Sequence, residues 1–209
     1  MLFDMLTNIQ KSVKAIPQLA RLICVGSVVV APTETAYGLL ADVTNTRAVA
    51  QVVRIKGREP GKPIALVAVD LKMVKKYFFL NVREQKIAKK FWPGPLTLLL
   101  KPKIKFPRAV VGPGGFVGVR VPGLAWLRRL ITTVDKPLTA TSANVAGGPT
   151  LYSAVAVCRA LKKRGLRYLV NGGVLQHRPT STVVSLGRGK LHLVREGAVS
   201  RARIERALA

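Results

Sequence analysis

Short apolar runs of strand length alternate along this chain with amphipathic runs of helical length. The valine-rich run at 27–31 is too short for a helix and stops at Pro32, which predicts a buried strand. A helix is predicted at 17–25, because proline is favoured in a first helical turn and Gly26 suits a C-cap. Further helices are predicted at 46–56, 71–77, 81–91, 124–133, 153–163 and 201–208, and further strands at 64–69, 96–100, 117–121, 138–140, 168–170, 182–186 and 191–195.

This order of elements predicts an α/β fold with a twisted, open, mixed sheet and flanking helices. No helix separates the last predicted strands, so the sheet is expected to be partly antiparallel there. Prolines and glycines gather at 91–95 and 107–115, but the composition does not change across them. Residues 1–209 are therefore predicted to form a single domain. Because 49% of the residues are hydrophobic and the mean hydropathy is +0.26, an intrinsically disordered polycation is excluded.

The charge of the chain is far larger than solubility requires. Lysine and arginine number 35 against 9 aspartate and glutamate, a formal net charge of +26. Basic residues occur along the whole chain rather than in a tail, so the charge belongs to the folded surface. This predicts an anionic partner, with an affinity for RNA that weakens steeply with salt.

Cysteine usage and hydropathy bear on the compartment. Cys24 and Cys158 show neither the spacing of a zinc site nor that of a disulfide framework, which favours a reduced, cytoplasmic protein. The first 30 residues do not follow the pattern of a secretory signal peptide. No apolar run approaches the roughly 18 residues of a membrane span, so no membrane partner is expected.

Four polar segments adjoin predicted strands, where ligands gather in open α/β sheets. Each alone is also compatible with an ordinary turn or cap. Lys56 and Arg58, on either side of a glycine, can clamp a polyphosphate, and the hydroxyls and amide of 139–144 can orient a phosphate or carboxylate. The four segments are Pro-Thr-Glu-Thr at 32–35, Lys-Gly-Arg at 56–58, Thr-Ala-Thr-Ser-Ala-Asn at 139–144, and Thr-Ser-Thr at 180–182 with Arg-Glu-Gly at 195–197.

The residue types that are scarce also restrict the chemistry. With only His177 and His192 and nine carboxylates, a triad hydrolase and a protein-built two-metal centre are disfavoured. Neither a Walker motif nor G-x-G-x-x-G occurs. A nucleotide reaction would rest on positioning and on cationic stabilisation of phosphates, with Mg²⁺ carried mainly by the nucleotide.

Taken in order, these segments resemble the YrdC-like family, the threonylcarbamoyl-AMP synthases, in its short single-domain form. The matching stretches lie between residues 28 and 199, about four fifths of the chain. They are VVVAPTETAYGLLAD, KGR, FWPGPLTLLL, VGVRVPG, PLTATSANVAGGP, NGG, STVVSL and VREGAV.

The resemblance implies a YrdC-like fold around a concave basic cleft, and a nucleotidyltransferase reaction. L-threonine, bicarbonate and ATP, the last with Mg²⁺, would give threonylcarbamoyl-AMP and pyrophosphate. The product would pass to a tRNA threonylcarbamoyl transferase complex for modification of tRNA.

Site residues are also implied, position by position. Lys56 and Arg58 resemble catalytic residues that bind the ATP phosphates, and Ser142, Asn144 and Arg195 resemble further ATP ligands. The family's L-threonine ligands correspond to Thr33, Arg120 and Ser181, with Arg120 the expected partner of the carboxylate. No residue is assigned to a metal.

Two other functions remain open at this point. The first is a non-catalytic RNA-binding or ribosome-assembly factor on the same fold, which the net charge alone would explain. Retention of Lys56, Arg58, Ser142, Asn144 and Arg195 argues against it, because RNA affinity requires only charge. The second is a carbamoyl-transfer module like the related domain of hydrogenase maturation proteins, which ordinarily comes with additional domains that 209 residues cannot hold.

Overall fold

The computed structural model describes residues 9–59, 61–187 and 190–209, and within them it is a mixed α/β structure. This confirms the predicted fold class, although the strands form two sheets instead of one. The larger sheet has the order β11-β10-β5-β6-β3-β7, with β4 paired to β5 at one side. Its strands are β3 Leu66–Val67, β4 Phe78–Phe79, β5 Leu96–Pro102, β6 Val117–Arg120, β7 Leu138–Thr139, β10 Thr182–Gly187 and β11 Lys190–Arg195.

The smaller sheet has the order β8-β2-β1-β9. Both sheets mix parallel pairs, such as β5 with β10 and β1 with β9, with antiparallel ones. The β10–β11 hairpin is antiparallel, as predicted. The strands of this sheet are β1 Val29–Pro32, β2 Tyr37–Leu40, β8 Thr141–Ser142 and β9 Tyr168–Leu169.

The chain passes from one sheet to the other at Ala140. The sequence predicted one strand at 138–140, whereas β7 pairs with β3 of the larger sheet and β8 pairs with β2 of the smaller one. Backbone hydrogen bonds hold the crossing: Thr139 N donates to Ala41 O at 2.9 Å, and Ala140 N donates to Ala65 O at 2.8 Å. Residues 141 and 142 are thereby fixed at the junction of the sheets.

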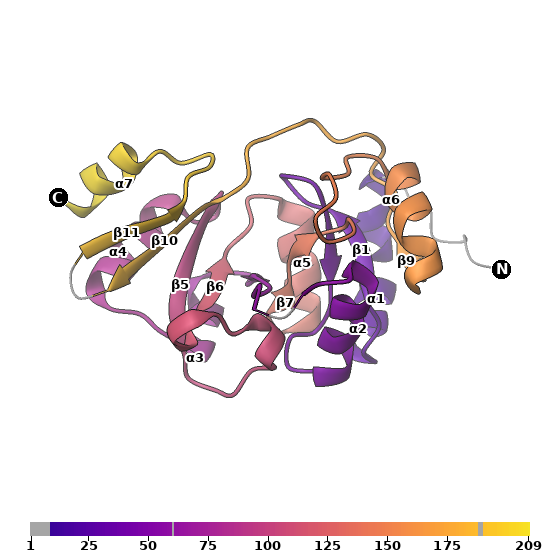
Figure 1. The fold of residues 1–209 in the computed structure, drawn as a ribbon, viewed down its shortest axis with the longest axis horizontal. Coiled ribbons are helices and arrows are strands. Elements are labelled where there is room, and N and C mark those ends of the chain that lie inside the picture. The colour runs from indigo at the N-terminus through magenta and orange to yellow at the C-terminus, as the bar shows by residue number, and fades with distance from the viewer. Residues whose placement is uncertain (1–8, 60, 188–189) are drawn as a thin grey trace.

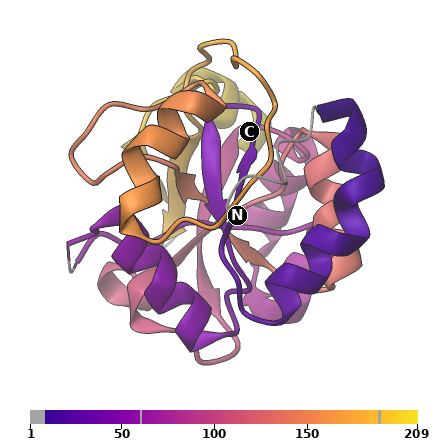
Figure 2. The same cartoon turned by 90° about the vertical axis from the view of Figure 1, so that its right-hand side faces the viewer.

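Helices cover both sheets. In Figure 2, α1 and α5 lie together on one side, and α2 and α6 lie on the other. The segment between β9 and β10 arches across the top of Figure 1 and connects the two ends of the molecule. The helices are α1 Ile9–Cys24, α2 Thr46–Lys56, α3 Leu71–Tyr77, α4 Val82–Phe91, α5 Ala125–Val134, α6 Ala154–Leu161 and α7 Arg201–Leu208, with short 3₁₀ turns at Arg108–Val110, Pro113–Gly115 and Lys162–Arg164.

The start of the first helix was predicted wrongly. It begins at Ile9 rather than at residue 17, so Pro17 lies inside it. The apolar positions Ile16, Leu19 and Ile23 follow a helical period across the proline, and all three are buried. Since a proline removes only one helical hydrogen bond, the burial of this stripe offsets its cost.

Several strands also differ from the prediction. β2, β4 and β8 were missed, and the strand predicted at 64–69 is only the two residues of β3. The short elements pair with partners distant in sequence, which a local pattern does not encode. By contrast, α2, α3 and α7 have the predicted bounds.

One cluster of buried hydrophobic residues extends between the sheets and helices. It contains side chains of β1, β2, β5 and β6 together with those of α1 and α5. Within the described residues, no helix combines the length and apolar character needed to cross a membrane.

Tyr37 connects the core to the Asn-Gly-Gly segment at 171–173. Its fully buried side chain donates through the hydroxyl to Gly173 O at 2.8 Å and accepts from Gly172 N at 2.9 Å. Tyr37→Phe leaves both backbone groups without this partner, and we expect the free energy of unfolding to fall by about 1–3 kcal/mol. Urea denaturation measures this, with Tyr168→Phe as control, since the Tyr168 hydroxyl has no partner in the described part of the chain. Equal stability of the two variants would contradict the role of this contact.

Candidate functional site

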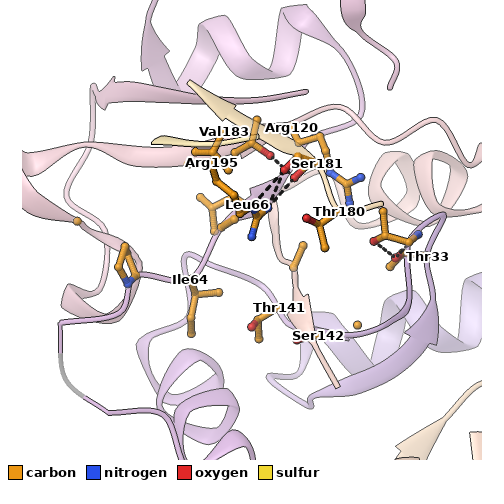
Figure 3. A pocket seen from close by; sticks show the side chains of 18 of the residues that line it. Thr33, Ile64, Leu66, Arg120, Thr141, Ser142, Thr180, Ser181, Val183 and Arg195 are labelled. Atoms are coloured by element: carbon orange, nitrogen blue, oxygen red, sulfur yellow. Dashed lines mark hydrogen bonds between the residues drawn. The ribbon is translucent and has the colours of Figure 1, made fainter. Parts of the chain in front are cut away.

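A cavity of about 760 Å³ lies where the two sheets meet. The smaller sheet contributes β2 and β8 to its wall, and the larger sheet contributes β3, β5, β6, β10 and β11. The volume is within the range of small-molecule sites. Figure 3 shows Thr141 and Ser142 on one side of it, with Arg120, Ser181 and Arg195 facing them. Of the eight site residues predicted from the sequence, Thr33, Lys56, Arg58, Arg120, Ser142, Ser181 and Arg195 line this cavity.

Asn144, the eighth predicted residue, is buried, is not among the residues that line the cavity, and contacts Lys56. The Lys56 ammonium donates to Ser142 O at 2.7 Å, to Ser142 Oγ at 3.2 Å and to Asn144 Oδ1 at 2.9 Å. The Asn144 amide nitrogen donates to Val145 O and Gly148 O, which turns Oδ1 toward the lysine. The predicted Lys56–Ser142–Asn144 group is therefore one connected hydrogen-bond network.

Lys56 is buried, with only 4% of the residue's surface exposed, and its ammonium forms no ion pair within the described residues. Burial, with a smaller contribution from the nearby positive charge of Arg58, lowers the pKa of Lys56 to about 8. Its hydrogen bonds go to neutral oxygens, so the positive charge is not neutralised by the protein. An anion entering the cavity would supply the missing negative charge.

Arg58 lies on the same wall because α2 ends at Gly57. Gly57 adopts a left-handed conformation with φ 62°, which ends the helix and lets the next residue leave its axis. The guanidinium donates to Pro63 O at 2.7 Å and to Thr141 Oγ1 at 3.2 Å. Burial lowers the pKa of Arg58. These contacts keep two cations, Lys56 and Arg58, beside the same part of the cavity.

Arg120, the predicted partner of a carboxylate, already contacts one. Its Nη1 is 2.5 Å from Glu34 Oε1, which also accepts from Gly123 N at 3.2 Å. The second oxygen, Glu34 Oε2, is buried without a hydrogen bond among the described residues. Burial lowers the pKa of Arg120, Glu34 opposes this shift, and Arg195 adds to it. Glu34 lies in the segment at 32–35 that the sequence singled out, but it had been given no role.

Thr33, Ser181 and Arg195 complete this side of the cavity (Figure 3). Thr33 is held by its own turn, since Oγ1 donates to Ala36 O at 2.6 Å. Arg195 Nη2 donates to Ser181 O at 2.8 Å, and burial lowers the pKa of Arg195. Arg195 was predicted to bind ATP and Ser181 to bind L-threonine, so the two predicted subsites meet at this contact.

Thr97 is a residue that sequence reasoning missed. It lies on β5 beside the parallel strand β10, and its hydroxyl is 2.9 Å from Ser181 Oγ. In the sequence it is one polar position of an apolar strand, with no local signal of function. Its contact fixes the Ser181 hydroxyl at the cavity wall.

Four cations, Lys56, Arg58, Arg120 and Arg195, thus surround one cavity, and Glu34 pairs with one of them, Arg120. They come from α2, the loop after it, β6 and β11, which are far apart in the chain. Neither His177 nor His192 is among the lining residues. No group of three or more His, Cys, Asp or Glu side chains in the described ranges could hold a metal ion. The four cations, together with the hydroxyl groups of the lining, suit the binding and orientation of anionic groups.

Comparisons with known proteins identify a family model and several relatives that match most of the chain. The model of the Sua5, YciO and YrdC family, described as "Telomere recombination", matches residues 21–197. A protein of Methanocaldococcus jannaschii, provisionally named a threonylcarbamoyl-AMP synthase, is 32% identical to this chain. The match covers 92% of this chain and 90% of that protein. The threonylcarbamoyl-AMP synthases of Pyrococcus abyssi and Bacillus subtilis are 32% and 34% identical over 88% and 91% of this chain. The chain spans only 54% and 55% of the length of those two relatives.

Solved structures show the same fold. The P. abyssi Sua5 complexed with L-threonine superposes with a TM-score of 0.86 at 31% identity, covering 93% of this chain and 57% of that one. Escherichia coli YciO superposes with a TM-score of 0.82 at 25% identity, covering 92% of this chain and 93% of that one. The resemblance seen in the sequence motifs is confirmed at the level of the fold and of the family model. The chain belongs to the Sua5–YciO–YrdC family.

Proposed function

We propose that this protein is an L-threonylcarbamoyladenylate synthase, which makes threonylcarbamoyl-AMP and pyrophosphate from L-threonine, bicarbonate and ATP. The observation that carries the proposal is the cavity in which the Lys56–Ser142–Asn144 network and three arginines converge. Support also comes from the names of the relatives and from the L-threonine bound to P. abyssi Sua5.

The proposed reaction needs positioned cations and no protein nucleophile. The amine of L-threonine attacks CO₂ derived from bicarbonate, forms a C–N bond and loses a proton to give a carbamate. A carbamate oxygen then attacks the α-phosphorus of ATP, the bond between the α-phosphorus and the bridging oxygen breaks, and pyrophosphate leaves. Negative charge grows on the phosphate oxygens in this step, and fixed cations in a half-buried cavity stabilise it.

The residues divide this work by their positions. Lys56 and Arg58 would bind the phosphates of ATP, with Ser142 and Asn144 holding Lys56 in place. Arg195 would contact the phosphates from the opposite side, beside Ser181. Thr33, Arg120 and Ser181 would hold L-threonine, whose carboxylate suits Arg120. ATP and L-threonine would then meet where Ser181 contacts Arg195.

The hydroxyl and amide groups of the cavity carry no charge, and they suit a nucleotide that arrives with Mg²⁺ already bound. Mg²⁺ would enter as part of the ATP substrate and would neutralise phosphate charge there. Ser142 lines the cavity, and its hydroxyl accepts from Lys56 at 3.2 Å. We propose that the protein acts in the cytoplasm, where ATP and tRNA are available, upstream of a tRNA threonylcarbamoyl transferase complex.

Product analysis tests the proposal. Purified protein with ATP, Mg²⁺, L-threonine and bicarbonate is expected to form threonylcarbamoyl-AMP, detected by mass spectrometry, with one pyrophosphate for each adenylate. Omitting L-threonine or bicarbonate should abolish both signals. Pyrophosphate release at the same rate without L-threonine would refute the synthase. A non-catalytic RNA-binding factor, the alternative function, would give no adenylate under any of these conditions.

The pKa of Lys56 predicts how ATP affinity depends on pH. Only the protonated ammonium attracts phosphate, and with a pKa of about 8 its protonated fraction falls about tenfold between pH 7 and pH 9. The dissociation constant for ATP is expected to rise by up to about this factor, because bound phosphate favours the charged form. Titration calorimetry at the two pH values measures it. Lys56→Met should remove most of this dependence, and an unchanged pH profile in that variant would assign the titration to another group.

A further inference from the structure

A second hollow lies outside the cavity, between α4 and α7. This α4–α7 groove has a volume of about 920 Å³. It is at the end of the molecule that carries the C-terminus, with both helices beside the β10–β11 hairpin (Figure 1). The described residues that line it are Val82, Gln85, Lys86, Lys89, Lys90, Phe91, Arg203, Arg206 and Ala207.

The groove is strongly positive. Five of its nine described lining residues are cationic and none is acidic. The cations stand on both walls, with Lys86, Lys89 and Lys90 on α4 and Arg203 and Arg206 on α7. Because residues three or four positions apart on a helix are about 5–6 Å apart, each wall presents an extended row of positive charge rather than a single point.

The carboxylates on and next to these helices are bound elsewhere and do not neutralise the groove. Glu84 is buried and forms a capping box with Asn81. Glu205 pairs with Arg201 at 2.7 Å, and Glu196 accepts from Arg201 N at 3.1 Å. The positive field of the groove is therefore not offset by its own helices.

Two of the five cations have structural roles that join the helices. Lys86 Nζ is 3.5 Å from Leu208 O at the end of α7, and the Arg203 guanidinium lies 5.9 Å from the centre of the Phe91 ring. Lys89, Lys90 and Arg206 are exposed and have no hydrogen bond or ion pair within the described ranges. They lie in the last turns of their helices, where the interaction of a cation with the helix dipole stabilises the helix by only a few tenths of a kcal/mol to about 1 kcal/mol. This small gain does not account for a groove lined on both sides by cations.

We propose that the α4–α7 groove binds the phosphate backbone of RNA. A linear polyanion matches rows of cations on two facing walls, which a compact anion would not fill. The catalytic cavity involves only four basic residues of a chain whose net charge is +26, so ATP does not explain the rest. Among linear polyanions we choose RNA, because the proposed function is a step in the modification of tRNA. Binding in the groove itself requires no step of adenylate formation.

Salt-dependent binding of an RNA probe tests the proposal. The probe is a fluorescently labelled, unmodified tRNA transcript, and the variant is the triple substitution Lys89→Ala, Lys90→Ala and Arg206→Ala. The matched control removes three charges from α3 by Lys72→Ala, Lys75→Ala and Lys76→Ala, all of which are exposed. Fluorescence anisotropy gives the dissociation constant at several salt concentrations. Urea denaturation checks that both variants fold.

The groove variant is expected to bind the transcript at least tenfold more weakly at low salt. The slope of log K against log salt should become shallower by about 2–3, roughly 0.7–0.9 for each lost phosphate contact. The α3 control should change the affinity less than threefold, and pyrophosphate release should be the same in all three proteins. Equal losses in the two variants would mean that affinity follows net charge alone, and unchanged binding in the groove variant would also overturn the proposal. If the groove variant loses binding to phosphatidylserine vesicles but not to RNA, the site belongs to a lipid surface.

Discussion

Lys56→Met is expected to reduce kcat/KM for adenylate formation by about 10²- to 10³-fold, as for the loss of one preorganised group that stabilises transition-state charge. Methionine keeps the aliphatic part of the buried side chain, so the packing at the end of α2 is retained. What is lost is the single ammonium that contacts Ser142 and Asn144 and whose charge no carboxylate neutralises within the described residues. Initial rates of pyrophosphate release, measured over a range of ATP concentrations, give the effect.

Arg47→Ala is the matched control, because it removes one exposed positive charge from the same helix. It should leave kcat/KM within about twofold, since Arg47 is not among the residues that line the cavity. If both variants lose activity equally, the effect follows the overall field of the protein rather than the position of Lys56. If Lys56→Met retains nearly full activity, the role given to the ammonium is wrong.

Gly197→Ala should both destabilise the protein and impair ATP binding. A Cβ at this position would lie 2.1 Å from Thr180 O, 2.7 Å from Ser181 C and 2.8 Å from Thr182 N. These are backbone atoms, so no side-chain rotation relieves the clash. The Thr182 hydroxyl accepts from Gly197 N at 3.0 Å, and Ala198 N donates to Thr180 O at 2.9 Å, so the segments cannot separate without breaking these bonds.

We expect overpacking to lower the free energy of unfolding by about 1–3 kcal/mol. Displacement of Ser181 and Arg195, which flank the contact, should lower kcat/KM by on the order of 10²-fold. Urea denaturation and steady-state kinetics measure the two effects separately. Gly187→Ala is the control, since no described atom lies within 4 Å of the position of its Cβ. A Gly197→Ala protein as stable and active as this control would show that residues 180–182 and 195–197 need not be in close contact.

Local sequence patterns predicted most of the regular structure. α2 was placed correctly because its apolar stripe coincides with an Asn45 cap and a left-handed Gly57. α1 was started too late because Pro17 is a frequent first-turn residue, whereas burial of the helix face on both sides of the proline extends the helix. The missed strand β2 contains Gly38, and its pairing with β1 and β8 creates a strand where the propensity is weak.

The candidate site was accessible from sequence because its residues occur in short polar segments next to strands. Lys56, Arg58, Ser142 and Arg195 lie in these segments, the resemblance to the family implied their roles, and the structure brings them to one cavity. Thr97 was not identifiable, since a single threonine in an apolar strand has no local signal until Ser181 is placed beside it. Glu34 was visible in the sequence, but its pairing with Arg120 depends on a contact between residues 86 positions apart.

The sequence by itself determined the α/β class, the four polar segments and the size of the net charge. These are local or additive properties, since periodicity, turn chemistry and charge can be read along the chain. Only the tertiary structure decided the division into two sheets at Ala140, the burial that lowers the pKa of Lys56, and the placement of basic residues in two separate sites, the cavity between the sheets and the α4–α7 groove. Each of these depends on which distant segments pack together, because solvation and electrostatic fields are set by neighbours in space and not by neighbours in sequence.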